Sequence, residues 1–397
     1  MKKTVSILLC LALILIASSP SASFASDAPE LSFDANGEFR ILQITDTQDD
    51  AYPARDLETF LTLAIGSTQP DLIVFTGDLV EDTRYGDIVS DNRPLLEGVV
   101  VKTLSGEIDV EKTRANIEKA VKAVFGVFES FGIPYLIALG NNDHRCGIDN
   151  SVWLEIFSAY PHCVVFDESP DESGRLDYRL SVKGTDGADK LDLYIMDSGG
   201  NGIGEEQIEW YCEESARLAE ERGSVLPALW FQHIPVAEVG NLFVPCDITT
   251  TGARMADGGW YTLNSDTASG FNLTGYAPGG SSAVFESWKA NGDVIGAFFG
   301  HMHVDGFTGT YDGVTLGLTY GCEFTKPGPY GFRTIDLNEE DAAGFKTDLY
   351  TYNGSAVFGT SSFTRQSDAD ETNPFAVFLL RLKSFFLALI SILIDIF

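Results

Sequence analysis

Five short polar motifs, each directly after an apolar strand-like run, constrain this chain more than any other feature. The runs span residues 39–44, 71–75, 134–139, 228–232 and 294–299. The motifs that follow them are Thr45-Asp46-Thr47-Gln48, Thr76-Gly77-Asp78, Gly140-Asn141-Asn142-Asp143-His144, His233-Ile234-Pro235 and Gly300-His301-Met302-His303. In open α/β sheets, ligands bind beyond the carboxyl ends of the strands. We therefore expect the five motifs to converge on one crevice.

The apolar runs alternate with stretches of helical periodicity, which predicts a buried sheet covered by helices. Helices are expected near 55–65 and over 110–131. After Gly300 the pattern changes to short strands separated by Gly and Asn turns, which favours a second, antiparallel-leaning sheet in the same domain. These later strands are expected over 307–310, 314–319, 332–337 and 345–352.

The formal net charge of -32 at pH 7 restricts the classes of partner. Nucleic acids and anionic lipids need Lys and Arg to replace their counterions, so this chain is a poor binder of either through long-range electrostatics. Any phosphate chemistry must therefore rest on local positive charge. Bound metal ions are the obvious source.

The N-terminus has the pattern of an export signal. Lys2 and Lys3 precede an apolar stretch over 5–17, and small residues near Ser23 and Ala25 permit cleavage. We expect residues 1–25 to be a signal peptide and the mature protein to be extracellular or associated with the cell envelope. Five cysteines remain after cleavage, and because none belongs to a CxxC pair, a thiolate metal site is not expected.

The C-terminus divides into a polar linker over 353–374 and an apolar segment over 375–397. Polar and small residues in the segment recur at spacings of three and four, which makes one narrow polar stripe on a helix. Its uninterrupted apolar part is far shorter than the ~20 residues that a membrane span needs. An amphipathic helix in peripheral contact with a membrane is the first interpretation, and a helix packed on the domain or on a partner is the second.

The ligand types in the motifs indicate a metal site when the motifs are taken together. A single Asp after a strand is usually a turn or cap residue, and a single His is usually structural. Four of the five histidines, however, lie in these motifs, and only His162 lies elsewhere. Carboxylate, amide and imidazole ligands suit Mn, Fe or Zn.

The order of the motifs resembles the calcineurin-like metallophosphoesterases over roughly residues 38–352. The segment Asp197-Ser198-Gly199-Gly200, with Gln207 and Trp210 downstream, is similar to the branch of small purple-acid-phosphatase-like proteins. The resemblance implies an α/β fold: a four-layer α/β/β/α sandwich of two mixed sheets flanked by helices, in one domain over 26–352. It also implies two divalent or trivalent metal ions and a bridging hydroxide that attacks phosphorus.

By motif position, the resemblance also assigns the metal ligands. The first ion would be held by Asp46, Gln48, Asp78 and His303, and the second by the shared Asp78 with Asn141, His233 and His301.

Two positions depart from the usual family pattern. Gln48 and Asn142 both stand where the family usually has His. The usual imidazole at the position of Asn142 contacts the phosphate or protonates the leaving group, so we expect His144, two residues later, to supply the acid. The coloured purple phosphatases have a Tyr ligand where this chain has Glu81, so no tyrosinate-to-iron colour is expected.

The function expected from these features is hydrolysis of a small-molecule phosphate ester: a phosphomonoester, a phosphodiester or a pyrophosphate. Gln48 and the missing imidazole at Asn142 favour diester or pyrophosphate substrates. A metal-binding pseudoenzyme that serves as a cell-surface binding protein is the alternative, and retention of the bridging carboxylate argues against it.

Overall fold

The computed structural model describes residues 30–81, 88, 109–169, 174–326, 328–354 and 361–366. The expected signal peptide over 1–25, the apolar segment over 375–397 and most of the linker between 353 and 374 lie outside these residues. Among the described residues, no helix combines the length and the apolar character that crossing a membrane requires. The five cysteines that are described carry free thiols.

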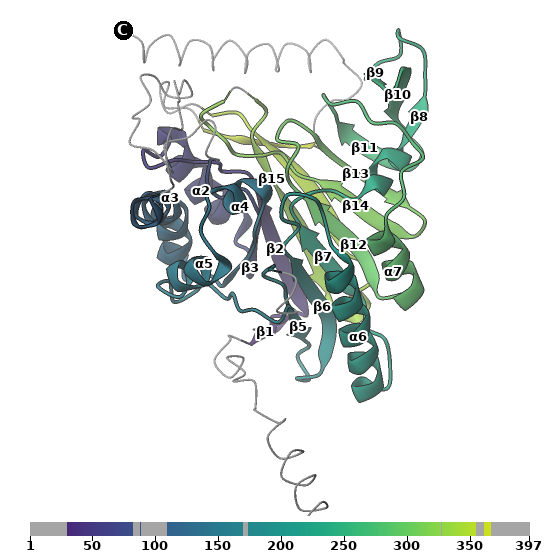
Figure 1. Cartoon of the computed structure of the whole chain (residues 1–397). Coiled ribbons are helices and arrows are strands. Elements are labelled where there is room, and N and C mark those ends of the chain that lie inside the picture. Colours follow the sequence, from purple (N-terminus) through teal and green to yellow (C-terminus); the bar gives the residue numbers. More distant parts are fainter. Residues whose placement is uncertain are drawn as a thin grey trace, which may run out of the picture.

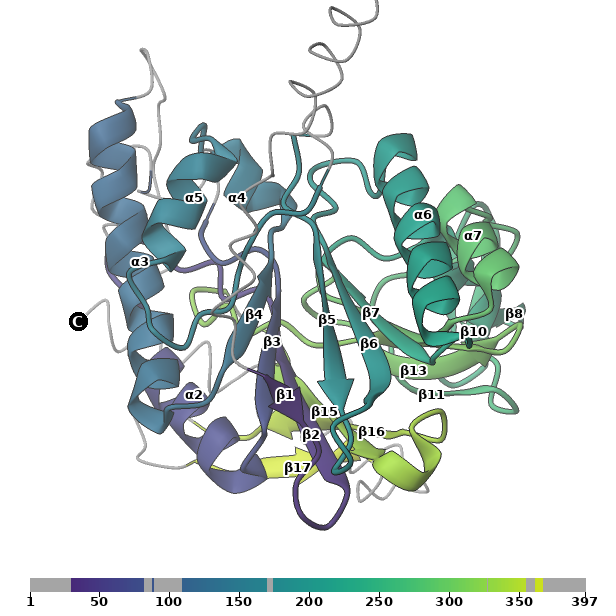
Figure 2. The same ribbon diagram turned by 90° about the horizontal axis from the view of Figure 1, so that it is seen from below.

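Two mixed sheets face each other in the centre of the molecule (Figures 1 and 2). The six-stranded sheet has the order β17-β16-β15-β2-β3-β4. Its strands are β2 (Glu38–Ile44), β3 (Leu72–Thr76), β4 (Tyr135–Ala138), β15 (Gly331–Asn338), β16 (Lys346–Tyr352) and β17 (Phe363–Arg365). Strands β2, β3 and β4 pair in parallel, while β15, β16 and β17 pair antiparallel, so the ligand-bearing edge is the parallel half.

The eight-stranded sheet has the order β1-β5-β6-β7-β12-β14-β13-β11. Its strands are β1 (Leu31–Ser32), β5 (Tyr178–Lys183), β6 (Asp189–Met196), β7 (Ala228–Gln232), β11 (Ala268–Phe271), β12 (Val294–Phe299), β13 (Gly306–Tyr311) and β14 (Val314–Leu318). Strands β6, β7, β12 and β14 are parallel neighbours, so β7 and β12 end at the same edge of this sheet.

Helices cover the two outer faces (Figure 2). The six-stranded sheet packs against α2 (Arg55–Thr68), α3 (Val110–Phe131) and α5 (Asn150–Phe157), and the eight-stranded sheet packs against α6 (Glu205–Arg222) and α7 (Ala283–Asn291). The expected four-layer α/β/β/α sandwich is therefore confirmed.

Alternation along the central strands explains why they are apolar throughout. In β3, Leu72 and Val74 pack between the two sheets, whereas Ile73 and Phe75 pack against the helices. Successive side chains of a strand point to opposite faces, so a strand between two layers has to be apolar at every position. In β3 the same burial leaves a polar residue only at the strand end, Thr76.

The strands after Gly300 do not form a separate sheet, contrary to expectation. Instead β13 and β14 join the eight-stranded sheet, and β15 and β16 join the six-stranded sheet. Short-range alternation predicts a strand but not its partners, because pairing depends on residues distant in the sequence. A third, three-stranded sheet also forms, from β8 (Phe243–Pro245), β10 (Gly259–Leu263) and β9 (Arg254–Ala256).

The domain extends beyond the expected boundary at residue 352. Within the stretch interpreted as a linker, β17 pairs with β16, and the ring of Phe363 lies 5.8 Å from that of Phe60 and 4.8 Å from that of Phe332 between centroids. The strand was not predicted because the residues around it are polar. The single aromatic residue Phe363 attaches it to the core.

Candidate metal centre

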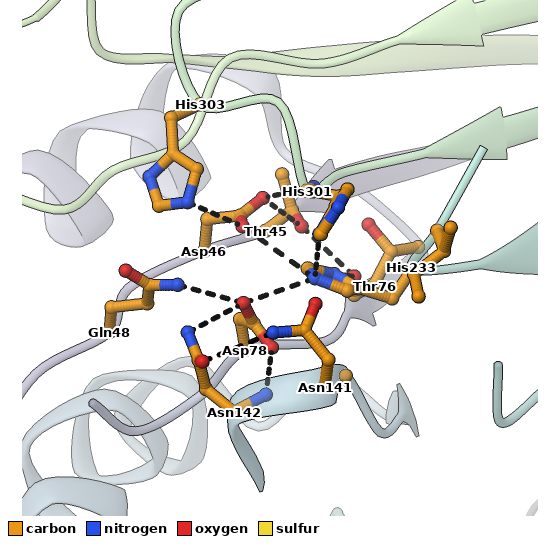
Figure 3. A network of polar contacts seen from close by, with 12 residues as sticks. Thr45, Asp46, Gln48, Thr76, Asp78, Asn141, Asn142, His233, His301 and His303 are labelled. Carbon is orange, nitrogen blue, oxygen red and sulfur yellow. Dashed lines mark hydrogen bonds and ion pairs between the residues drawn. The ribbon is translucent and has the colours of Figure 1, made fainter. Parts of the chain in front are cut away.

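All five motifs meet at one edge of the sandwich, between the ends of the two sheets (Figure 3). Asp46 and Gln48 follow β2, Asp78 follows β3, and His233 follows β7. Asn141 and Asn142 begin α4 (Asn141–Arg145) after β4, and His301 and His303 follow β12. The parallel halves of both sheets thus deliver their polar ends to the same place, as the sequence predicts.

The side chains form two groups with one member in common. Potential ligand atoms of Asp78, His233 and His301 all lie within 4.8 Å of one another, and so do those of Asp46, Asp78 and His303. Nε2 of His233 is 3.1 Å from Oδ2 of Asp78, and Nε2 of His303 is 3.4 Å from Oδ1 of Asp46. This is the arrangement of two adjacent metal positions bridged by a single carboxylate.

The backbone of the site is held in a conformation that most residues avoid. Among the described residues, eight other than glycine have positive φ, and five of them are predicted ligands: Asp46, Gln48, Asp78, His301 and His303. Each such residue costs of order 1–3 kcal/mol and persists only because the surrounding structure enforces it. Concentration of this strain at one site indicates selection for function rather than for stability.

Close approach of the loops requires glycine at two positions. Gly77 has φ +86°, and a Cβ there would lie 2.8 Å from the Cβ of His233. A Cβ on Gly140 would lie 2.3 Å from Oδ1 of Asp78. Any larger residue at either position would push the ligand loops apart.

The donor set fits cations. Among the described residues, Oδ1 of Asp46 is buried without a hydrogen-bond partner. The amide of Asn141 lies 2.8 Å from Nδ1 of His301, and turning the amide over lets its nitrogen donate to this ring. A cation would satisfy Oδ1 of Asp46, and mixed nitrogen and oxygen ligands suit Mn, Fe or Zn.

The pKa values of two histidines also indicate a site that attracts cations. Burial lowers the pKa of His233, but the carboxylates of Asp78 and Asp46 outweigh it and raise this pKa to about 10. Burial also lowers the pKa of His303, yet the charge of Asp46 and the hydrogen bond that His303 donates to Glu323 raise it to about 9. The field that retains a proton on these buried imidazoles would retain a metal ion in its place.

The chain matches the family described as calcineurin-like phosphoesterase over residues 39–305. It belongs to the calcineurin-like phosphoesterases. The Arabidopsis thaliana protein named "Probable inactive purple acid phosphatase 28" is 28% identical over 332 residues, covering 72% of this chain and 70% of that protein. The protein named "Probable inactive purple acid phosphatase 14", from the same plant, is 26% identical over 347 residues, covering 76% and 75%. A solved dimetal phosphatase from Danio rerio aligns with a TM-score of 0.47 and 12% identity, covering 83% of this chain and 98% of that chain.

Gln48 is the predicted ligand whose orientation fits this phosphoesterase centre least. Its amide nitrogen donates to Oδ2 of Asp78 at 2.7 Å, and its oxygen faces Nζ of Lys326 at 3.5 Å. Coordination by the amide oxygen would require the amide to turn over and leave Lys326. The ligand role of Gln48 stays a prediction.

Asn142 contacts the carboxylate of Asp78, which would bridge two ions. Its backbone N–H donates to Oδ1 of Asp78 at 2.8 Å, and its amide nitrogen donates to Oδ2 at 2.9 Å. Its amide oxygen accepts from Nη1 of Arg145 at 3.1 Å. Asn142 therefore orients Asp78 and connects Arg145 to the centre.

His144, the expected acid, pairs with a residue that the sequence did not assign to the site. Its Nε2 lies 2.7 and 2.8 Å from the two oxygens of Asp197, which follows β6 and is buried. Backbone N–H groups of Leu176 and Gly199 also donate to this carboxylate. The remaining histidine, His162, pairs with Glu129 outside the site.

Two further carboxylates, Asp143 and Glu323, hold the loops that carry the ligands, and the sequence did not assign either of them to the site. Asp143 accepts from the backbone N–H groups of Gly140, Asp78, Leu79 and Val80. Burial and the charge of Asp78 raise the pKa of Asp143 to about 7.

Glu323 is the second of these carboxylates. It lies 2.9 Å from Nδ1 of His303, just as the carbonyl of Thr76 lies 2.8 Å from Nδ1 of His233. Such contacts fix each ring so that Nε2 faces the carboxylates of the candidate metal centre. Asp143 lies within a recognised motif and could have been found there, whereas Glu323 carries no local signal.

Proposed function

We propose that the protein is an exported, dinuclear metal-dependent hydrolase of phosphate esters. The observation that carries the proposal is the pair of ligand groups sharing Asp78, in a chain that belongs to the calcineurin-like phosphoesterases. Asp46, Asp78 and His303 would hold one ion, and Asp78, His233, His301 and Asn141 the other. When bound, two such ions supply an activated water as nucleophile and offset charge that develops on the phosphate.

The chain's own residues position the groups around phosphorus. Asn142 and Gln48 fix the carboxylate of Asp78 by donating to it. His144 is half-buried, and its Nε2 is hydrogen-bonded to Asp197. The other ring nitrogen, Nδ1, would therefore donate the proton to the leaving group. This pair replaces the imidazole that the family usually has at the position of Asn142.

Metal content and turnover together test the proposal. The purified protein should bind about two ions of Mn, Fe or Zn per chain and hydrolyse an aryl phosphate, a bis-aryl phosphate or pyrophosphate in a metal-dependent way. An Asp78→Asn variant should lose both properties. Turnover that survives complete removal of metal would overturn the mechanism.

A catalytically weak, metal-binding pseudoenzyme with a cell-surface binding role is the second candidate. It is favoured by the orientation of Gln48, whose amide presents nitrogen rather than oxygen to the centre, and by relatives that are named inactive. Two bound ions without turnover of any of the three substrates would support it.

We also propose that the protein is exported and contacts the membrane through residues 375–397. The signal-like N-terminus and the apolar, polar-striped C-terminus support these two steps. Deletion of residues 374–397 should release the protein from the membrane fraction and leave its activity intact. Membrane association that survives the deletion would contradict the second step.

A further inference from the structure

Two arginines lie near His144, and one of them, Arg145, also contacts the amide of Asn142 in the metal centre. Arg145 follows His144 on α4, and Arg175 precedes Leu176, whose N–H donates to the Asp197 carboxylate that binds His144. They are local cations in a chain with 58 acidic and 26 basic residues.

Arg145 is connected to the metal centre through the side-chain amide of Asn142. Its Nη1 donates to the amide oxygen of Asn142 at 3.1 Å, and Asn142 in turn donates to Oδ2 of Asp78 at 2.9 Å. The guanidinium is therefore two hydrogen bonds from the bridging carboxylate.

Arg175 is positioned by the Asp197-Ser198-Gly199-Gly200 turn. A Cβ on Gly199, which has φ +47°, would lie 1.7 Å from Nη1 of Arg175. The turn accordingly leaves room for the guanidinium to lie on its backbone. The carboxylate of Asp197 fixes both segments, because it accepts from the backbone N–H of Gly199 and from that of Leu176, the residue after Arg175. The turn thus brings Arg175 next to His144.

The other half of the centre has a different charge pattern. Lys326 lies near Gln48 and is ion-paired with both Glu81 and Glu323. Glu81 and Glu323 are both buried, so they add negative charge to that half. A substrate with an anionic group beside the reacting phosphorus would therefore place that group toward His144.

We propose that Arg145 and Arg175 form a subsite for a second phosphate group, and that the preferred substrate of the proposed hydrolase is a diphosphate ester. The inference rests on the proposed function and names its substrate class. Guanidinium groups bind phosphate oxygens through paired, charge-assisted hydrogen bonds. The departing group would lie between the two arginines, whose charges would stabilise it alongside the acid His144. A phosphate needs less protonation to leave than an alkoxide does.

The chemical step balances with water as the only co-reactant. The oxygen of water bonds to the terminal phosphorus, and the P–O bond to the bridging oxygen breaks. The departing phosphate ester keeps the bonding electron pair, and the proton of water passes to solvent or to the products. A diphosphate ester thus gives inorganic phosphate and a phosphate monoester.

Phenyl phosphate and phenyl diphosphate form a matched pair of probes that differ by one phosphate group. The metal-loaded wild-type protein should prefer phenyl diphosphate in kcat/KM. Arg145→Gln and Arg175→Gln should each lower the ratio of diphosphate to monophosphate kcat/KM by roughly 10- to 100-fold, as expected for losing hydrogen bonds to a charged group. Arg217→Gln removes the same charge from the exposed face of α6 and should leave the ratio unchanged.

Binding separates failure of this inference from failure of the proposed function. Calorimetry would compare methylenediphosphonate with methylphosphonate on the metal-loaded protein. A preference for the diphosphonate that both arginine variants lose supports the subsite, even if neither ester is hydrolysed and the proposed hydrolase is thereby rejected. The subsite would be overturned if the arginine variants lost kcat/KM equally on both phenyl esters, or if the wild-type protein bound both phosphonates with equal affinity. Phosphomonoester hydrolysis would remain possible in either case.

Discussion

The imidazole of His144 is bound through Nε2 to both oxygens of the buried carboxylate of Asp197, at 2.7 and 2.8 Å. The two residues are far apart in the sequence, and the second lies at the end of β6 in the opposite sheet. Their pairing joins the Asp197-Ser198-Gly199-Gly200 turn to the motif after β4. It therefore gives this turn a role at the metal centre.

The pH profile should report this pair. Burial lowers the pKa of His144, but the hydrogen bond and charge of Asp197 raise it by more, so the net shift is upward. An acid must be protonated to act, so the rate on a poor leaving group should fall as pH rises through this pKa. Asp197→Asn removes the raising charge and should move that fall to lower pH. His144→Ala should abolish this fall of the rate with rising pH.

Asp189→Asn is the matched control for the pH profile, since Asp189 lies at the other end of β6 and pairs with Arg222. It should leave the profile unchanged. Wild-type rates and profile in His144→Ala on a poor leaving group would refute the acid role.

Asp78→Asn should remove both metal ions, whereas Asp46→Asn should remove one. The reason is that Asp78 belongs to both ligand groups and Asp46 to one. Metal content per chain, measured by plasma mass spectrometry after dialysis, distinguishes the two. The exposed Asp186→Asn serves as the control. Equal losses in both variants would mean that Asp78 is not a bridge.

Glu323→Gln should weaken metal binding at one position only. Glu323 accepts from Nδ1 of His303, and loss of such an outer contact typically reduces metal affinity by about 10- to 100-fold. Competition with a chromophoric chelator measures the two affinities separately. Glu118→Gln on the surface of α3 is the control. An equal change at both positions would point to general unfolding of the site.

Metal affinity should rise with pH through the neutral range. The pKa of His233 is raised to about 10 and that of His303 to about 9, so both rings carry a proton at neutral pH until an ion displaces it. Binding should therefore release about two protons per chain at pH 7. Calorimetry in buffers of different ionisation enthalpy counts them. A pH-independent affinity would show that the imidazoles are not ligands.

The strand β17 should contribute measurably to stability. Phe363 packs against Phe60, Phe332 and Tyr352. A chain that ends after residue 354 should be less stable than one that ends after residue 366 by about 1–3 kcal/mol, the contribution of one large apolar side chain. Denaturant unfolding of the two chains measures the difference. Equal stability would restore the interpretation of 353–374 as a linker.

The sequence by itself determined the parallel strands and the polar motifs at their ends, and the resemblance to a family implied the four layers. Strands such as 71–75 are apolar at every position because both faces are buried, and this pattern, like the Asp and His residues after each strand, is visible locally. A position directly after a parallel strand fixes the edge at which a residue lies, so convergence could be predicted without knowing any distance.

Only the tertiary structure decided which residues support the site and which strands share a sheet. Asp197 and Glu323 reach the centre from segments without a metal-binding motif, and β13 to β16 divide between the two sheets through long-range pairing. The orientation of the Gln48 amide depends on Lys326, distant in sequence. Such contacts join segments that no local pattern connects, because hydrogen bonds and packing depend on position in space rather than on sequence spacing.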